Sequence, residues 1–424
     1  MNFLKKTYYF FSDYTGPDER EVAKFFSKIH ENQSYEDVRP LLVKLIQKNI
    51  IAINLWTEFK YRQYKYLKKS ERKLLYENIH ALRADFEKYY INSKHLPEMI
   101  LKEIKAFGVN TDKLSDKTQK LIYLKSIMDY LSPRAGRYSY RESSTFGALL
   151  KDPTKEKLVG DCNQIVTLYI YLYSLKYDVL DLQIKTYPGH VALHFYGIDI
   201  EATNGQFANY KKEEQMILPI EEIVSLNMLD VTDNYYKTHE VSAVALLEAS
   251  RVAYVLSSQR EIVEKNLITA YNNAVVEMLN SSSYKKALEF ARASGDQKLI
   301  ATAGHNGAIY YMKENNFKRA LEFAEYSKDS DKLKHAIHQN EGAYYFNKGN
   351  YNYAIIAFEN AGDSDAVKTC YGALFNDEQK KLGSIKTTED LKANKKIIHN
   401  MDSYAKKSGN QSLINYVSDL KKYL

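Results

Sequence analysis

Residues 160–175 read GDCNQIVTLYIYLYSL, and this stretch decides the fold of the central part of the chain. Gly160 allows a tight turn, Asp161 is a residue type that often caps a helix, and the apolar run after them predicts the helix itself. A thiolate at a helix N-terminus is stabilised by unpaired backbone amides and by the positive end of the helix dipole. We therefore expect Cys162 to be a reactive nucleophile; a small buried cysteine that only packs is the alternative.

Downstream of this helix, apolar residues alternate with polar ones, which is typical of β-strands. The alternating sets are Leu182, Ile184 and Thr186, then Val191, Leu193 and Phe195, then Ile198 and Ile200. Before the cysteine, residues 117–131 have a helical pattern that ends at Ser132-Pro133. A helix followed by paired strands predicts an α+β domain, which we place at residues 116–225.

His190 opens the second predicted strand, and Glu201 lies near the end of the third. A short turn at Tyr196-Gly197 would join these strands in a hairpin, with His190 across from Glu201 and Thr203. A carboxylate in that position can orient the imidazole and favour its charged form. The predicted catalytic residues are therefore Cys162, His190 and Glu201.

Two neighbouring residues compete for these roles. His194 falls on the same strand face as His190, and we interpret it as a structural or solvated histidine. Asp199 alternates in phase with Glu201 and is the alternative orienter of the imidazole. The mechanism also needs donors for an oxyanion, and the backbone amide of Cys162 is the expected one.

Three short motifs resemble the transglutaminase-like family of the papain-like cysteine enzymes: Gly160-Asp161-Cys162, His190-Val-Ala-Leu and Glu201-Ala202-Thr203. The family has a Gly-x-Cys helix start, a histidine that begins an alternating strand, and an Asp-Pro-Thr motif. The resemblance implies an enzyme that acts on amide bonds through a thioester, as a peptidase, deamidase or transamidase, with a protein or peptide substrate. Glu201 and Ala202 depart from the Asp-Pro pattern, so a catalytically weak or inactive scaffold that binds protein partners is the alternative.

The C-terminal part of the chain repeats. Residues 309–317 (IYYMKENNF) match residues 343–351 (AYYFNKGNY) at a spacing of 34, and Ala320 matches Ala354. This resembles the tetratricopeptide repeat, a two-helix unit. We predict helical repeats with C-terminal capping helices over residues 245–424, in which Ala308 and Gly342 lie where helices approach closely. The resemblance implies that the repeats dock a protein partner or the substrate.

Residues 1–115 have helical patterns, with expected helix starts at Pro17 and after Ser34 and one long helix over residues 55–90. Within that helix, residues 60–73 carry seven basic side chains against one acidic one, interleaved with tyrosines. Such a segment can bind nucleic acid or a membrane surface. We favour a solvated helix face whose tyrosines pack inward, and expect no nucleic-acid partner.

Composition sets the outer limits. A chain of 424 residues is longer than a domain with one hydrophobic core usually is, so more than one domain is expected. A hydrophobic fraction of 45% argues against wholesale disorder. The two cysteines, Cys162 and Cys370, have neither metal-site nor disulfide-framework spacing, so no metal or cofactor is expected and Cys370 should only pack. The apolar run at residues 7–11 is too short for a secretory or membrane-spanning segment, which predicts a cytoplasmic protein. Altogether we expect a mostly helical multidomain chain with a central α+β domain.

Overall fold

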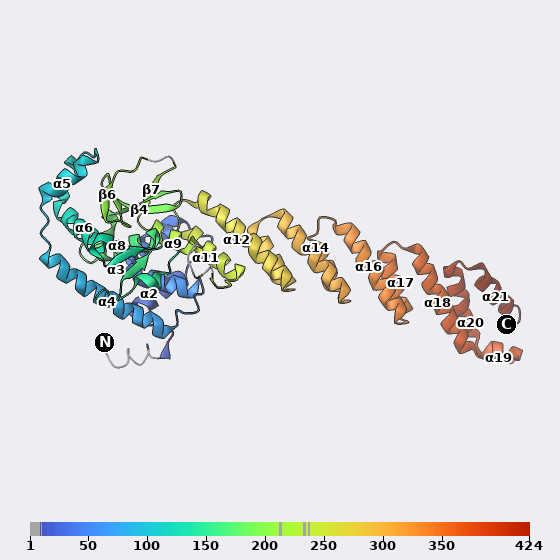
Figure 1. Ribbon diagram of the computed structural model, residues 1–424. Coiled ribbons are helices and arrows are strands. Elements are labelled where there is room, and N and C mark those ends of the chain that lie inside the picture. The colour runs from blue at the N-terminus through green and yellow to red at the C-terminus, as the bar shows by residue number, and fades with distance from the viewer. Residues whose placement is uncertain (1–8, 10, 212–213, 232–234, 236–237) are drawn as a thin grey trace. The chain divides into compact units, whose positions relative to one another are not determined.

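The computed structural model describes residues 9, 11–211, 214–231, 235 and 238–424 (Figure 1). The chain is mostly helical with a small antiparallel sheet, and it divides into two compact units, Met1–Asn273 and Ala274–Leu424. The described residues contain no helix with the length and hydropathy that crossing a bilayer requires. Most of the apolar run at residues 7–11 precedes or interrupts the described part, so the expectation about it stays a prediction.

Some helices of the first unit begin directly after a residue whose side chain caps them. The unit contains α2 (Pro17–Phe26), α3 (Tyr35–Lys60), α4 (Lys69–Asn92), α5 (Pro97–Ala106), α6 (Thr118–Leu131), α7 (Phe146–Leu149), α8 (Cys162–Ser174), α9 (Glu222–Leu229) and α11 (Ala243–Leu256). The Ser34 side chain accepts a bond from the Asp37 amide, and Asp37 accepts the Ser34 N–H at 2.8 Å. This reciprocal cap satisfies two amides that the first turn would otherwise leave unpaired. The helix starts predicted at Pro17 and after Ser34 are confirmed.

The single helix predicted over residues 55–90 is wrong. α3 ends at Lys60 and α4 begins at Lys69, and Gln63 between them has a φ of 52°. The chain turns inward here because Tyr64 and Leu67 are fully buried, with the Tyr64 ring stacked 4.1 Å from that of Tyr235. Burial of these two side chains therefore outweighs the helical propensity of a segment without glycine or proline.

The sheet has the strand order β6-β5-β4-β3-β7, all antiparallel. Its strands are β3 (Gln183–Tyr187), β4 (His190–Phe195), β5 (Ile198–Glu201), β6 (Gln206–Ala208) and β7 (Met216–Pro219), which confirms the three predicted strands. Leu193 pairs with both Ile184 and Ile200, so these apolar side chains share one face. The other face carries the polar residues Lys185, His190, His194, Asp199 and Glu201. A separate parallel pair joins β1 (Tyr138–Tyr140) to β2 (Leu158–Gly160).

One hydrophobic core runs through the first unit, with members from Val22 in α2 to Leu256 in α11. α3 packs directly on α8, so the N-terminal helices cover the helix that begins with Cys162. The predicted regions 1–115 and 116–225 therefore share one core. The predicted third region, 245–424, begins inside the first unit, because α11 contributes Val252 and Leu256 to the same core.

The second unit is a series of helices, most of which pack on the next helix in the chain. After α12 (Arg260–Asn280), which crosses the division, come α13 (Tyr284–Ser294), α14 (Gln297–Lys313), α15 (Phe317–Ala324), α16 (Ser330–Asn347), α17 (Tyr351–Asn360), α18 (Ser364–Leu382), α19 (Thr388–Ala393), α20 (Lys395–Ser408) and α21 (Gln411–Lys421).

Two glycines allow close helix contacts in this series. A Cβ on Gly342 would lie 2.6 Å from the Phe358 ring, and a Cβ on Gly307 would lie 2.2 Å from the Phe323 ring. In α14 a close approach thus falls at Gly307, next to Ala308, where it was expected. Ala308 is itself fully buried.

Candidate active site

Cys162 is the first residue of α8, and a reciprocal cap fixes this helix start. Asp161 Oδ1 accepts the Gln164 N–H at 3.2 Å, and Gln164 Oε1 accepts the Asp161 N–H at 3.1 Å. Gly160 has no left-handed φ; a Cβ there would lie 3.1 Å from Leu149 Cδ1, so close packing rather than the expected turn calls for glycine. The thiol is therefore held at the amide-rich end of a buried helix.

His190, the first residue of β4, lies beside Glu201, the last residue of β5. Its Nε2–H donates to Glu201 Oε2 at 2.7 Å. Thr203 donates its hydroxyl to Glu201 Oε1 at 2.6 Å and its N–H to the same oxygen at 3.2 Å. Burial alone would raise the pKa of Glu201, but the bonds from His190, Thr203 and Tyr210 lower it. The carboxylate is thus ionised and fixed against the imidazole.

His190 and Cys162 line the same cavity and lie close enough for the charge of one to act on the other. Because Nε2 is engaged with Glu201, Nδ1 is the ring nitrogen left for the thiol. Burial alone would lower the pKa of His190, but the neighbouring Cys162 thiol and the bonded Glu201 carboxylate raise it to about 9. At neutral pH the imidazole is therefore protonated, and it can act as a proton donor beside the thiol. The structure brings together the three residues that the sequence singled out.

A cavity of about 480 Å³ opens onto Cys162 and His190. This volume lies within the usual range for small-ligand sites. Tyr187 also lines this cavity, and the centroid of its ring lies 5.0 Å from that of the His190 ring. The other lining residues are apolar (Val191, Leu226, Leu229, Ile262, Val263), acidic (Glu142, Asp161, Asp230), or small, polar or aromatic (Tyr140, Ser143, Asn163, Thr186, Gly189, Asn266). A substrate segment can therefore reach the sulfur.

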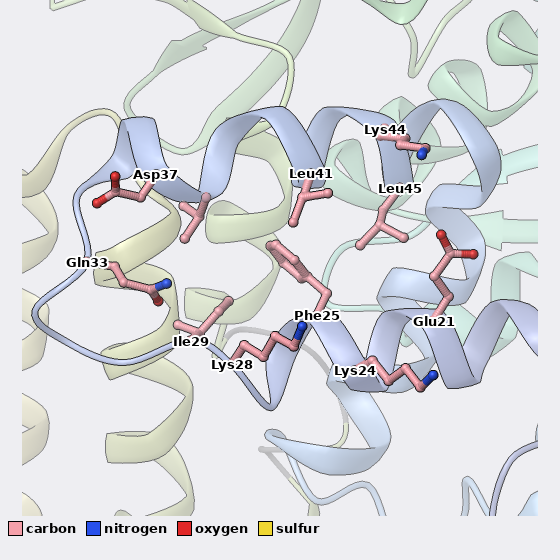
Figure 2. Close-up of a pocket in the computed structure, with 11 residues that line it drawn as sticks. Glu21, Lys24, Phe25, Lys28, Ile29, Gln33, Asp37, Leu41, Lys44 and Leu45 are labelled. Atoms are coloured by element: carbon pink, nitrogen blue, oxygen red, sulfur yellow. The ribbon is translucent and has the colours of Figure 1, made fainter.

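A second cavity, of about 250 Å³, lies between α2 and α3 (Figure 2). Phe25, Leu41 and Leu45 form its apolar floor, and Lys24 and Lys28 lie along its α2 side. The described residues that line this second cavity include neither a cysteine nor a histidine. Nucleophilic chemistry is therefore assigned to the cavity at Cys162.

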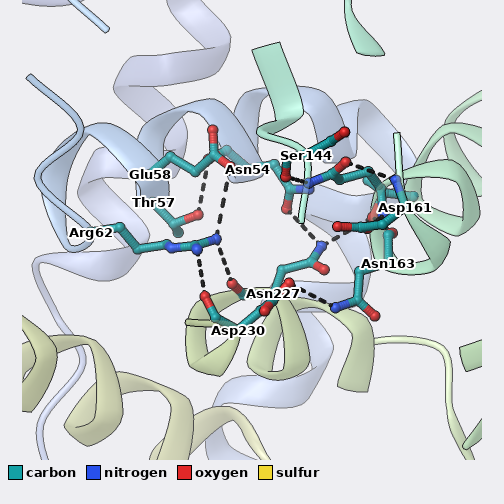
Figure 3. Close-up of polar contacts among 11 residues, drawn as sticks. Asn54, Thr57, Glu58, Arg62, Ser144, Asp161, Asn163, Asn227 and Asp230 are labelled. Atoms are coloured by element: carbon teal, nitrogen blue, oxygen red, sulfur yellow. Dashed lines mark hydrogen bonds and ion pairs between the residues drawn. The ribbon is translucent and has the colours of Figure 1, made fainter. Parts of the chain in front are cut away.

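A polar network ties the start of α8 to the N-terminal helices (Figure 3). Asn163 donates to Asp230 Oδ2 at 3.1 Å. Arg62 donates to the backbone carbonyl of Asn227 at 3.0 Å and to that of Asp230, at the C-terminal end of α9. Asn227 in turn donates to Thr167 of α8 at 3.0 Å. A cation at the C-terminal end of a helix complements the carbonyl groups that lack a partner within the helix. Arg62 therefore holds Asp230, and Asp230 binds Asn163, the residue directly after Cys162.

The same network places two carboxylates close together. Burial, followed by the nearby charge of Asp230, raises the pKa of Asp161 to about 7. Hydrogen bonds from the first amides of α8 oppose this rise. Near neutral pH the residue directly before Cys162 is thus partly protonated.

His194 and Asp199 form a cluster of their own on the polar face of the sheet. His194 Nδ1 lies 2.7 Å from Asp199 Oδ1, and Lys185 Nζ lies 2.7 Å from Asp199 Oδ2. All three side chains are buried. Burial would raise the pKa of Asp199, but the bonds from His194 and Lys185 lower it. The carboxylate that reaches His190 is therefore Glu201, and His194 is held inside the protein.

Sequence reasoning missed several residues around the site. Tyr210 donates its hydroxyl to Glu201 Oε2 at 2.7 Å, although it lies in irregular chain after β6 and belongs to no motif. The roles of Arg62 and Asp230 could not be predicted either, because their contacts join segments far apart in sequence. Cys370 is fully buried in α18, where burial raises its pKa to about 11. No protein-family model, curated protein or solved structure matches this chain.

Proposed function

We propose that this protein is a cysteine-dependent enzyme that hydrolyses an amide bond in a protein or peptide. Cys162 is the nucleophile, His190 is the acid that protonates the leaving nitrogen and then the base that activates water, and Glu201 is the residue that orients His190. The observation that carries this proposal is the position of His190, which lines the same cavity as Cys162 and bonds Glu201 at 2.7 Å. The resemblance of the three motifs to the transglutaminase-like family supports the same chemistry.

The reaction follows from this arrangement. The Cys162 thiolate attacks the carbonyl carbon of the substrate, and the Cys162 amide stabilises the oxyanion that forms. The His190 imidazolium gives its proton to the leaving nitrogen as the C–N bond breaks, which leaves a thioester. His190 then takes a proton from water, the hydroxide attacks the thioester, the C–S bond breaks and the acid is released. An amine in place of water would complete a transamidation by the same steps.

The helices of the second unit are proposed to dock the substrate or a protein partner. A cavity of about 570 Å³ there is lined by aromatic residues and by both basic and acidic side chains, including Tyr311, Tyr326, Arg292 and Glu322. Aromatic and arginine side chains are enriched where proteins bind one another. A reducing compartment such as the cytoplasm, which keeps Cys162 as a free thiol, is the proposed location.

Covalent labelling tests the nucleophile. Iodoacetamide at pH 6, followed by peptide mapping, should modify Cys162 well before Cys370, and His190→Ala should remove this preference. Equal labelling of the two cysteines, or labelling of Cys162 that rises only near the free-thiol value of about 8.5, would instead favour the inactive scaffold.

A further inference from the structure

Tyr210 contacts the oxygen on which the orientation of His190 depends. Its hydroxyl donates to Glu201 Oε2 at 2.7 Å, and the same oxygen accepts the His190 Nε2–H at 2.7 Å. Burial and the Glu201 charge raise the pKa of Tyr210 well above its ordinary value. The phenol therefore keeps its proton and acts as a donor across the neutral range.

The backbone of Tyr210 is itself held on both sides. Its N–H donates to Asp199 Oδ2 at 2.8 Å, and its carbonyl accepts a bond from Lys185 Nζ at 2.8 Å. Lys185 and Asp199 form an ion pair of 2.7 Å whose side chains are 5% and 2% exposed. Such a buried pair is weak evidence for a gain in stability, because desolvation offsets the attraction. Its geometric effect is plain: it fixes one residue of an irregular segment against the site.

We propose that Tyr210 is a positioning residue for the catalytic carboxylate, held in place by the Lys185–Asp199 pair. This inference rests on the proposed function. Thr203 fixes Oε1 of Glu201 and Tyr210 fixes Oε2, so the carboxylate cannot turn about its terminal torsion, which is otherwise broad. Without the hydroxyl, Glu201 turns away from His190, the imidazolium loses its partner and Cys162 becomes less reactive.

Tyr210→Phe tests this in the full chain, since it removes only the hydroxyl. The rate of Cys162 modification by iodoacetamide should fall about tenfold at pH 6, the loss expected for one charge-assisted hydrogen bond, and its pH midpoint should rise. Tyr196→Phe is the matched control, because that hydroxyl also donates to a carboxylate, Asp181 at 3.0 Å, at the turn end of the same hairpin. It should leave the rate unchanged.

A double-mutant cycle separates positioning from structure. If Tyr210 acts through Glu201, then Tyr210→Phe should have no further effect in a Glu201→Gln background. Additive losses, or a Tyr210→Phe pH profile identical to wild type, would overturn the inference. The melting midpoint of each variant shows whether a loss of labelling is a loss of folding, and a loss explained by unfolding also counts against the inference. Wild-type Cys162 that labels no faster than Cys370 would overturn the proposed function itself.

Discussion

His194 Nδ1 lies 2.7 Å from Asp199 Oδ1, so each of the two histidines of β4 has a carboxylate of its own. His190, whose carboxylate is Glu201, is the one that lines the same cavity as Cys162. The two pairs lie on one face of the sheet and differ in what else they bind: Asp199 also holds Lys185. This arrangement separates the effects that the two carboxylates have on reactivity and on stability.

Glu201→Gln and Asp199→Asn should therefore give opposite results. Glu201→Gln keeps the shape but removes the partner of the imidazolium, so Cys162 labelling at pH 6 should fall about tenfold or more with little loss of stability. Asp199→Asn leaves Lys185 as a buried unpaired charge, which should cost about 3–5 kcal/mol of unfolding free energy. Labelling in the folded fraction should also fall, but less than in Glu201→Gln, because Asp199 acts on Glu201 only through Tyr210. Labelling rates and urea titrations of both variants measure this, and the reverse pattern would make Asp199 the orienter.

The raised pKa of His190 predicts how stability depends on pH. The pKa is 6.5 in an unfolded reference and about 9 in the fold. The stabilisation from the charged imidazole is thus fully present below about pH 6.5 and is lost as the pH rises through 9. The difference in unfolding free energy between wild type and His190→Gln should shrink from pH 6 to pH 10 in urea titrations. Glu201→Gln should flatten this difference, and a difference that grows with pH would contradict the raised pKa.

The two helical glycines Gly307 and Gly372 form a matched pair in the second unit. A Cβ on Gly307 would lie 2.2 Å from the Phe323 ring, whereas a Cβ on Gly372 would meet nothing within 4 Å. Gly307→Ala should therefore cost about 1–3 kcal/mol through overpacking. Gly372→Ala should be neutral or stabilise by up to about 1 kcal/mol, because alanine favours helix. Hydrogen exchange across residues 297–382, which include α14 and α18, reports both, and equal effects would mean that α14 and α15 are not in close contact.

Arg72 and Lys73, two neighbouring basic residues near the start of α4, should also differ in how much their substitution lowers the free energy of unfolding. Arg72 is buried, bonds Glu19 at 2.9 Å and donates to the carbonyls of Leu67 and Asp13, whereas the Lys73 side chain is 72% exposed. Arg72→Met should cost about 3–5 kcal/mol, and Lys73→Met should stay within about 0.5 kcal/mol in urea titrations. Equal, small effects accompanied by loss of salt-sensitive nucleic-acid binding would restore the nucleic-acid interpretation of residues 60–73.

Local signals made much of this fold predictable. The caps at Ser34 and Asp161 act within three residues, and the alternation from Leu182 to Ile200 reports a face buried along each strand. The approach of His190 to Glu201 followed from one tight turn. Each of these depends on residues close in sequence, where spacing fixes geometry.

The rest depends on tertiary contacts that no local pattern contains. Residues 61–68 leave the helix because Tyr64 finds a partner in Tyr235, far along the chain. Tyr210 reaches Glu201 because Lys185 and Asp199 hold its backbone. The division after Asn273 likewise reflects which helices share a core. Sequence spacing alone could not have identified any of these.

Because one core runs from Val22 to Leu256, the part of the chain that must be kept together is larger than the segment that carries the motifs. A piece cut to residues 116–225 would keep Cys162, His190 and Glu201 but leave the surface of α8 that packs on α3 open to water. Gene fusion or transplantation of this thiol chemistry into another protein therefore has to move α2 to α11 together. The N-terminal helices are part of the scaffold that holds the nucleophile and have to be transferred with it.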